Sequence, residues 1–436
     1  MIEKETDDVD ADVIVVGGGV AGALCACQLA RSGRQVILIE RGGQPGSKNL
    51  SGGVFYCRVM ERIFPDFLEA APIERHITRN VLCFLNPASH FCIDGWDRRL
   101  ADPVNAVTVL RARLDAWLLE KCEDAGVMVM PGVRVDALLT AGDRITGVRA
   151  GADELRARMV VAADGVNSFI ARSAGIRARE PAKNLAIGVK SVIGLPTAVI
   201  EDRFRVTGNE GVAYAMVGDC TQGVAGGGFL YTNRDSVSVG VVMRLDDLDA
   251  KGVSSSRIHD HFLAHPAVAP LIRGGELREY GAHLTIENGP AMASHDIARP
   301  GLLIVGDAAG FTLNTGLAVR GMDLAAGSAL AAARAIDRAF ERTDFGQRMA
   351  DDYRAELDAS FVGADMKTYA RAPDFLESPR MYEDYGPLLA DIFLDILRLD
   401  TTPKKRAAAI AAAAFRRSPV TLFQAATDML KGGRAL

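Results

Sequence analysis

The chain has 436 residues, of which 49% are hydrophobic and 24% are charged, so it is long enough for two or three domains with buried cores. This composition excludes a disordered chain, a collagen-like fibre and a small disulfide scaffold. Its 50 basic and 55 acidic residues give a net charge of −5, and we therefore expect no nucleic-acid partner.

The chain opens with a predicted strand–helix–strand unit. The acidic, polar residues 1–10 do not resemble a secretory signal. Residues 12–16 (DVIVV) are a short, mostly β-branched run that is typical of a buried parallel strand. Residues 23–31 predict a helix closed by Gly33, and residues 36–39 (VILI) predict a second buried strand. A parallel unit of this kind is a common carrier of dinucleotide sites.

The motif Gly17-x-Gly19-x-x-Gly22 lies between the first strand and the helix. The first glycine permits a tight turn, the second lets a pyrophosphate approach the backbone, and the third lets the helix pack close to the strand. The amides of the helix N-terminus then face the phosphates. Glu40 ends the second strand, where a carboxylate accepts hydrogen bonds from ribose hydroxyls and repels a 2′-phosphate. These features predict a dinucleotide site.

The middle of the chain gives a less regular pattern. Residues 43–60 predict a loop rich in Gly and Ser, and residues 61–100 mix short apolar runs with polar loops. From 184 to 243 the period shifts toward two, which predicts an inserted, mostly antiparallel sheet, and residues 254–280 predict helices. The elements expected before that sheet are a helix at 110–125, strands of a small meander at 127–130, 133–139 and 147–150, and a buried strand at 159–163.

A second glycine-lined turn, Gly306-Asp307-Ala308-Ala309-Gly310, follows a predicted buried strand at 302–305. A nicotinamide dinucleotide needs no second strand-end carboxylate, whereas the ribityl chain of a flavin does, and Asp307 has that place. A long Ala-rich helix predicted over 321–342 directs its N-terminal amides toward the flavin N1–C2=O edge, with 314–316 as the approach loop. We therefore expect the cofactor to be FAD.

A third strand end carries Asp164-Gly165, followed by Asn167-Ser168. The ordered trio of turns resembles the glutathione-reductase-like FAD flavoproteins, in the branch of aromatic hydroxylases and geranylgeranyl reductases. Further runs are similar to the FixC family, close to the electron-transfer-flavoprotein:quinone oxidoreductases. These runs are Glu40-Arg41-Gly42, Pro45-Gly46-Ser47-Lys48-Asn49, Gly52-Gly53, Pro65-Asp66-Phe67, 226–233 (GGGFLYTN), 319–324 (VRGMDL) and 377–381 (ESPRM).

The resemblance implies a FAD-dependent oxidoreductase that relays electrons from an electron-transfer flavoprotein or similar donor to a quinone-like or ferredoxin-like acceptor. The quinone oxidoreductases carry a C-terminal iron–sulfur domain, whereas this chain has no cysteine after Cys220. We therefore expect any cluster to belong to a separate ferredoxin-like protein. Electron relay needs no side-chain acid or base, so no catalytic residue is assigned. A stand-alone FAD-dependent dehydrogenase, oxidase or monooxygenase acting on a small organic molecule is the alternative.

The expected fold is α/β: a Rossmann-like FAD-binding domain of the glutathione-reductase type, an inserted antiparallel β-sheet substrate domain and a helical C-terminal region. We predict a discontinuous FAD-binding domain (1–50, 101–175 and 283–345), a substrate or acceptor domain (51–100 and 176–282) and the helical region (346–436). The residues expected to bind FAD are Gly17, Gly19, Val20, Ala21, Gly22, Glu40, Arg41, Lys48, Gly52, Arg111, Val135, Asp164, Gly165, Gly306, Asp307, Gly316, Gly321 and Met322. The residues expected in the substrate pocket wall are Tyr56, Phe229 and Tyr231, with ordinary sheet packing as the alternative for the last two.

The remaining signals concern metals, redox state and membranes. Seven cysteines at irregular spacing predict no disulfide framework and a reducing, cytoplasmic compartment. His259, His261 and His265 predict a surface helix and no metal site. No run reaches the roughly 18 apolar residues of a membrane span. Residues 407–417 are apolar with flanking Lys and Arg, and both an interfacial helix at the inner face of a membrane and plain core packing stay open.

Overall fold

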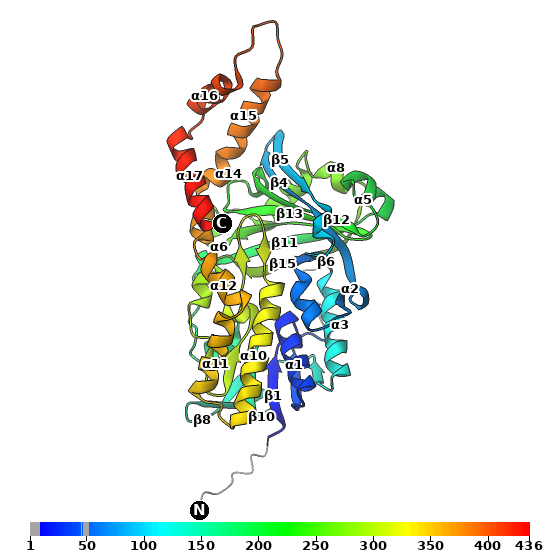
Figure 1. The fold of residues 1–436 in the computed structure, drawn as a ribbon, viewed down its shortest axis with the longest axis vertical. Helices are drawn as coiled ribbons and strands as arrows, with labels where there is room; N and C mark the ends of the chain where they lie inside the picture. The colour runs from blue at the N-terminus through cyan, green and yellow to red at the C-terminus, as the bar shows by residue number, and fades with distance from the viewer. Residues whose placement is uncertain (1–8, 45, 47–51) are drawn as a thin grey trace, which may run out of the picture.

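The computed structural model describes residues 9–44, 46 and 52–436. Figure 1 shows a lower half built on a parallel sheet, an upper half built on a second sheet, and an arm of C-terminal helices that projects from the upper half. The chain passes between the halves several times, because strands of each sheet come from separated stretches of sequence.

The first sheet has the strand order β16-β17-β10-β1-β2-β7. Its central strands pair in parallel, and the residues through which they pair are apolar, since both faces of the sheet are covered there. Helix α1 packs against α3 and α10 on one face. The elements are β1 (Ala11–Val16), α1 (Val20–Arg31), β2 (Val36–Glu40), α3 (Arg111–Asp124), β7 (Met128–Pro131), β8 (Ala137–Ala141), β9 (Arg144–Ala150), β10 (Asp153–Ala162), β16 (Ala298–Arg299), β17 (Leu302–Ile304) and α10 (Met322–Arg342).

The carboxyl ends of four neighbouring parallel strands meet at one edge of this sheet. Backbone bonds extend the register past the strands: Gly17 N donates to Ile39 O at 2.8 Å and Ala163 N to Val16 O at 2.8 Å. Val305 N likewise donates to Ala162 O at 2.9 Å. The residues that follow β1, β2, β10 and β17 are therefore brought side by side, as expected for the ligand edge of an open α/β sheet.

The second sheet has the order β15-β11-β14-β13-β12-β4-β6-β3, with β5 paired to β4. It is antiparallel except where β4 and β12 pair in parallel. Along β14, Val237, Val239 and Val241 are buried in a core beneath α5, α7 and α8, so the alternate residues face the first sheet. The elements are β3 (Gly53–Phe55), β4 (Ile73–Asn86), β5 (Ser89–Trp96), β6 (Val107–Val109), β11 (Leu185–Gly194), α5 (Thr197–Phe204), β12 (Glu210–Gly218), β13 (Gly226–Thr232), β14 (Ser236–Arg244), α7 (Ser255–Ala264), α8 (Ala269–Ile272) and β15 (Glu276–Ile286).

The C-terminal region is helical, and its last three helices form the projecting arm of Figure 1. None of the helices within the described residues is long and apolar enough to cross a bilayer. This region comprises α11 (Gln347–Asp358), α12 (Phe361–Thr368), α13 (Ala372–Leu376), α14 (Pro379–Glu383), α15 (Tyr385–Leu397), α16 (Ala407–Arg417) and α17 (Leu422–Ala435). The short remaining elements are α2 (Phe67–Ala70), α4 (Phe169–Ser173), α6 (Leu245–Lys251), α9 (Gly289–Ala293), β18 (Leu313–Asn314) and β19 (Val319–Arg320).

Three predicted elements differ from the structure. Residues 61–100, expected to be short runs and loops, contain the long strand β4 and its partner β5. The strand near 127–130 joins the parallel sheet beside β2 rather than the meander. The helical prediction over 254–280 ends too late, because β15 already begins at Glu276.

Two side-chain predictions are also wrong. His259 and His265 are buried rather than on a surface, and each is stabilised by a polar contact: His259 with Ser191 Oγ, and His265 with the Asn86 carbonyl. Cys83 and Cys92 form a disulfide, because they lie directly opposite one another in the β4–β5 pair. The other five cysteines are free and buried.

Candidate functional site

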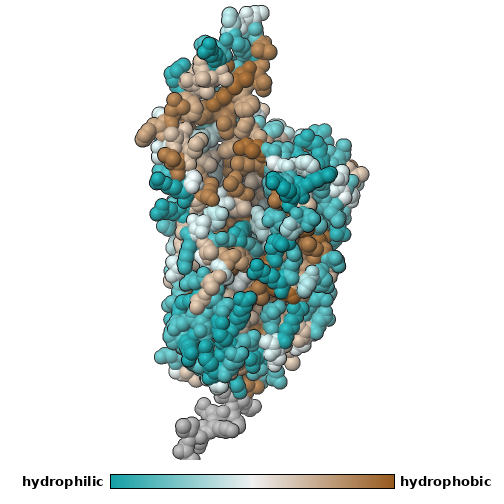
Figure 2. All heavy atoms as spheres, viewed as in Figure 1, coloured by the Kyte–Doolittle hydropathy of each residue, from teal (hydrophilic) through white to brown (hydrophobic). Residues whose placement is uncertain are grey.

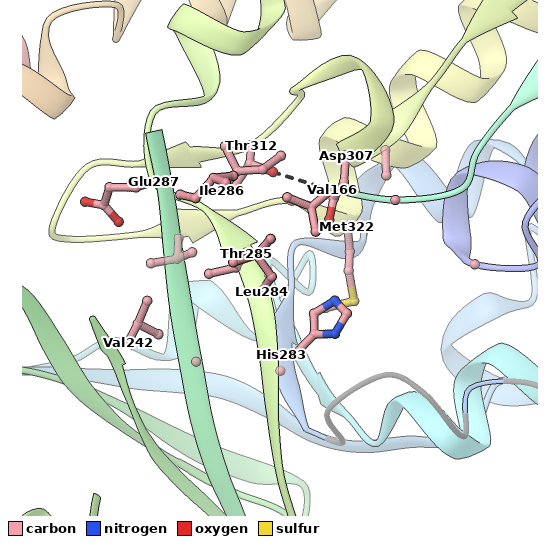
Figure 3. A pocket seen from close by; sticks show the side chains of 18 of the residues that line it. Val166, Val242, His283, Leu284, Thr285, Ile286, Glu287, Asp307, Thr312 and Met322 are labelled. Carbon is pink, nitrogen blue, oxygen red and sulfur yellow. Dashed lines mark hydrogen bonds between the residues drawn. The ribbon is translucent and has the colours of Figure 1, made fainter. Parts of the chain in front are cut away.

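A cavity of about 1440 Å³ lies between the carboxyl edge of the parallel sheet and the inner face of the second sheet. It exceeds the roughly 300–1,000 Å³ of common small-molecule pockets. Its lining extends from the glycine turn after β1 to residues of the C-terminal region. Figure 3 shows one end, where β15 side chains face the turn that carries Asp307 and the start of α10.

The glycine turn after β1 forms a cradle on the cavity floor. A Cβ on Gly17 would lie 2.3 Å from the Ala163 carbonyl oxygen, and one on Gly22 would lie 1.9 Å from the Gly17 oxygen, so both positions require glycine. Among the described residues, a Cβ on Gly19 would meet only Arg111 Nη2, at 3.8 Å. Gly19 caps α1 without a side-chain bond, and the first turn carries no acid. The free amides of this helix therefore face open space that suits a pyrophosphate.

Glu40 forms the wall beside this cradle. Its Oε2 accepts a hydrogen bond from Gly18 N at 2.8 Å, and its Oε1 accepts one from Gly42 N at 2.5 Å. The carboxylate is thereby fixed in orientation while oxygen lone pairs stay available to ribose hydroxyls. Arg41 and Val135 line the adjoining end of the cavity.

Arg111, the first residue of α3, carries a positive charge to the cradle. Its Nε and Nη2 donate to the two carboxylate oxygens of Asp115 at 2.8 and 2.9 Å. Asp115 is fully buried and holds the guanidinium beside Gly19. A fixed guanidinium in this place suits a diphosphate.

Asp307 lies in the short 3-10 turn η5 (Gly306–Ala309) after β17. This turn touches the first glycine turn, because a Cβ on Gly306 would lie 2.8 Å from the Ala21 Cβ. Thr312 Oγ1 donates to Asp307 Oδ1 at 3.4 Å. Burial raises the pKa of the Asp307 carboxyl, while Arg111 and His283 oppose that shift. The two turns, far apart in sequence, thus contribute residues to one cavity.

Asp164 has a different part in the site. Its carboxylate accepts hydrogen bonds from Ser168 Oγ at 2.6 Å and from Ile170 N at 3.0 Å, and so fixes the start of α4. Gly165 follows at a φ of +82° with open space at its Cβ position. The side chain of Asp164 therefore holds the turn, and the backbone of the turn lines the cavity.

The inner face of the second sheet forms the ceiling. Phe229 and Tyr231 stack there with ring centroids 5.0 Å apart. Lys190 and His283 project from β11 and β15 onto the same face, and Figure 3 shows the His283 ring beside the Met322 thioether. Sequence analysis missed both residues, because neither belongs to a motif. The period-two pattern of β11, which places Lys190 two residues from Gly188 on the cavity face, was the only available signal.

Most of the predicted site residues are brought together in this cavity. Gly22 and Gly306 pack behind it, and Tyr56 does not line it. Lys48 lies outside the described residues. The predicted residues that line the cavity are Gly17, Gly19, Val20, Ala21, Glu40, Arg41, Gly52, Arg111, Val135, Asp164, Gly165, Phe229, Tyr231, Asp307, Gly316, Gly321 and Met322.

A parallel sheet whose carboxyl edge presents a glycine turn and two separate strand-end carboxylates to one cavity is the arrangement expected of a FAD-dependent oxidoreductase. When bound, FAD accepts and donates the electrons. The family of FAD binding domains matches residues 10–213, and the C-terminal domain of the ETF-QO/FixC family matches residues 372–436.

The chain belongs to the ETF-QO/FixC family of flavoproteins. It is 45% identical to the probable electron transfer flavoprotein-quinone oxidoreductase YdiS of Escherichia coli K12, over 90% of this chain and 92% of that protein. It is 43% identical to protein FixC of Salmonella typhi, over 89% of this chain and 91% of that protein. The predicted family and cofactor are confirmed.

Solved structures confirm the predicted fold class. A geranylgeranyl bacteriochlorophyll reductase-like protein of Thermoplasma acidophilum superposes with a TM-score of 0.71 at 19% identity, covering 94% of this chain and 96% of that one. The flavin-dependent brominase Bmp2 gives a TM-score of 0.61 at 16% identity, covering 93% of this chain and 98% of that one. At such identities the likeness concerns the fold alone.

Proposed function

We propose that this oxidoreductase takes electrons from an electron-transfer flavoprotein or similar donor and passes them through FAD to a quinone-like acceptor. The names of the FixC and quinone-oxidoreductase relatives support this proposal. In it, Glu40 binds the adenosine ribose, the Gly17–Gly22 turn and Arg111 bind the pyrophosphate, and Asp307 binds the ribityl chain. A ferredoxin-like protein is the other acceptor that the family allows.

The observation that most favours a quinone-like acceptor is the apolar lining at the far end of the cavity. The C-terminal region lines the cavity with four apolar side chains and one phenol: Phe375, Leu376, Met381, Leu436 and Tyr382. An apolar end of this kind suits a ring with a hydrocarbon tail better than a charged metabolite.

One carboxyl lies in this far part of the cavity. Burial raises the pKa of Glu287 to about 7, and Arg244 opposes the shift. Glu287 is one of the residues that line the cavity, and Figure 3 shows it at the end of β15. A group that holds its proton near neutral pH suits an acceptor that takes up protons with electrons.

The test is oxidation of the chemically reduced holoprotein by a short-chain ubiquinone analogue in an anaerobic stopped-flow experiment. We expect a rate that saturates with quinone. Met381→Trp, which fills the apolar end, lowers the affinity for quinone, whereas Met429→Trp on the exposed arm does not. An oxidation rate that never saturates and ignores both variants contradicts the proposal. Rapid flavin reduction by a small metabolite without a protein donor supports the stand-alone enzyme instead.

We also propose that the terminal arm, α15–α17, contacts a membrane surface. Figure 2 shows apolar residues gathered over the arm. Leu399, Phe423 and Met429 are each at least 80% exposed. Lys404, Lys405 and Arg406 lie between α15 and α16. Apolar side chains beside cations are typical of helices that lie on anionic bilayers.

Co-sedimentation with vesicles tests the membrane proposal. We expect the holoprotein to bind vesicles that contain phosphatidylglycerol and to bind neutral vesicles more weakly. The double variant Phe423→Asp/Met429→Asp loses binding. Met128→Asp, at a position 61% exposed in the other half of the molecule, retains it. Equal binding by both variants contradicts the proposal.

A further inference from the structure

We propose that Lys190 tunes the bound flavin by its charge: the reduction potential of the flavin is higher when the Lys190 amine is protonated. The proposal depends on FAD binding and not on the identity of the donor or the acceptor.

The position of Lys190 in the second sheet points its side chain at the cavity. It lies opposite Gly240 of β14 and Gly281 of β15, so neither neighbouring strand places a side chain beside it. Its Nζ donates a hydrogen bond to the Gly52 carbonyl oxygen and lies 5.4 Å from the centre of the Phe229 ring. Gly52 leads into β3, where a Cβ on Gly53 would lie 3.3 Å from Met322 Cε. The ammonium is thus held between the ceiling and the segment that faces the start of α10.

The part of the cavity around Lys190 is where a flavin ring must lie. A dinucleotide that starts at Glu40 and passes the first glycine turn reaches Asp307, and the cavity then continues to Gly321 and Met322 under the second sheet. Lys190, Phe229 and His283 form the ceiling there. Within the described part of the chain Lys190 forms no salt bridge, so its charge is not neutralised by a carboxylate at contact distance.

Other charged groups face the same space. Arg111 from α3 and Glu279 from β15 act on Lys190 with opposite signs. His283 from β15 and Asp307 from η5 also interact. Tyr231 from β13 is partly buried, and its desolvation raises the pKa of the phenol. Burial lowers the pKa of Lys190 to about 7, so this residue changes charge near neutrality. Burial also lowers the pKa of His283 below its usual 6.5, so that ring is neutral above this range.

A cation at this place favours the electron-rich, reduced form of a nearby flavin, because reduction adds negative charge to the ring. The direction of the pH effect on the reduction potential follows from this charge. Below the pKa of Lys190 the ammonium is present and the potential is higher; above it the amine is neutral and this contribution is lost. The variant Lys190→Arg keeps the positive charge at every pH tested, and Lys190→Met removes it at every pH tested.

The experiment measures the midpoint potential of the holoprotein by equilibration with reference dyes between about pH 6 and pH 8.5. At the acid end we expect Lys190→Met to shift the ratio of reduced to oxidised flavin by about tenfold toward the oxidised form, or about 30 mV for a two-electron couple. At the alkaline end the wild type and Lys190→Met converge, whereas Lys190→Arg stays above both. His283→Gln retains the convergence, and Lys183→Met, at an exposed position, behaves as the wild type.

Protonation of the flavin itself contributes equally to the potential of every variant, so this contribution cancels when variants are compared at the same pH. Identical potentials for Lys190→Met and the wild type at every pH overturn the proposal. Convergence of Lys190→Arg with Lys190→Met at high pH also overturns it, as does loss of the pH dependence in His283→Gln. If Lys190→Met fails to bind FAD, the comparison of Lys190→Arg with the wild type at high pH still decides the matter.

Discussion

Alanine substitutions at Gly19 and Gly22 distinguish a loss of space for the cofactor from a loss of folding stability. Within residues 9–44, 46 and 52–436, a methyl group at position 19 meets only the end of the Arg111 side chain, at 3.8 Å, and the backbone there (φ −75°, ψ −175°) suits alanine. Gly19→Ala therefore costs the apoprotein only about 0.5 kcal/mol, as expected for a lost N-cap glycine. The same methyl occupies the space reserved for a pyrophosphate. An intrusion of this size costs about 1–3 kcal/mol, or roughly 5- to 150-fold in FAD affinity.

Gly22→Ala has the opposite effect, because it lowers the stability of the apoprotein itself. Its Cβ would lie 1.9 Å from the Gly17 carbonyl oxygen, so the backbone itself must move and the apoprotein loses about 1–3 kcal/mol or more. Denaturant unfolding of the apoprotein and fluorescence titration with FAD measure the two effects. Gly43→Ala is the control, because no atom of the described residues lies within 4 Å of its Cβ position. Wild-type FAD affinity in Gly19→Ala would refute the assignment of this turn.

Three further outcomes are expected. Asp307→Ala largely abolishes the visible flavin absorbance of the purified protein, and retention of full absorbance would count against its role at the ribityl chain. Arg111→Met weakens FAD binding with a reduced salt dependence, whereas an unchanged affinity would place the diphosphate elsewhere. Glu287→Gln raises the melting temperature of the holoprotein at about pH 8 but not at about pH 4. The folded wild type binds an extra proton between the ordinary pKa of 4.5 and the raised value of about 7, so its stability falls as pH rises through this window. Equal differences at both pH values would contradict this account.

The parallel half of the fold could be predicted because its signals are local. The runs VIVV, VILI and LLIV are buried strands read directly from composition, and each is followed by a glycine or a carboxylate at the ligand edge. Since parallel strands end at the same edge, the turns that carry Glu40, Asp164 and Asp307 line one cavity even though the sequence separates them widely.

Strand β4 could not be predicted, because its polar residues resemble a loop. Arg75 is buried, and its Nε donates to the Asn233 carbonyl oxygen at 2.7 Å. Arg79 forms an ion pair with Asp94 of β5. These partners lie far along the chain or on the next strand, so the compensation for burying each charge is visible only in the fold. The Cys83–Cys92 disulfide could not be predicted for the same reason, since it depends on the register of β4 and β5.

Phe229 and Tyr231 of the ceiling were predicted, whereas Lys190 and His283 were missed for a different reason. Lys190 and His283 are single residues on alternating strands, and a titratable residue on a strand gives no sign of which face is covered. The pairing of β11 with β14 and β15 decides that Lys190 faces the cavity while Val189 is buried in the opposite core.

The central claim is that one FAD molecule spans the cavity from Glu40 to Asp307 and places its ring beneath the second sheet. A crystal structure of the FAD-bound protein tests this most directly. The account predicts adenosine ribose hydroxyls within hydrogen-bond distance of Glu40, ribityl hydroxyls at Asp307, and the ring between Met322 and the Lys190–Phe229 ceiling. A bound FAD that contacts only one of the two carboxylates, or whose ring lies away from that ceiling, would contradict it.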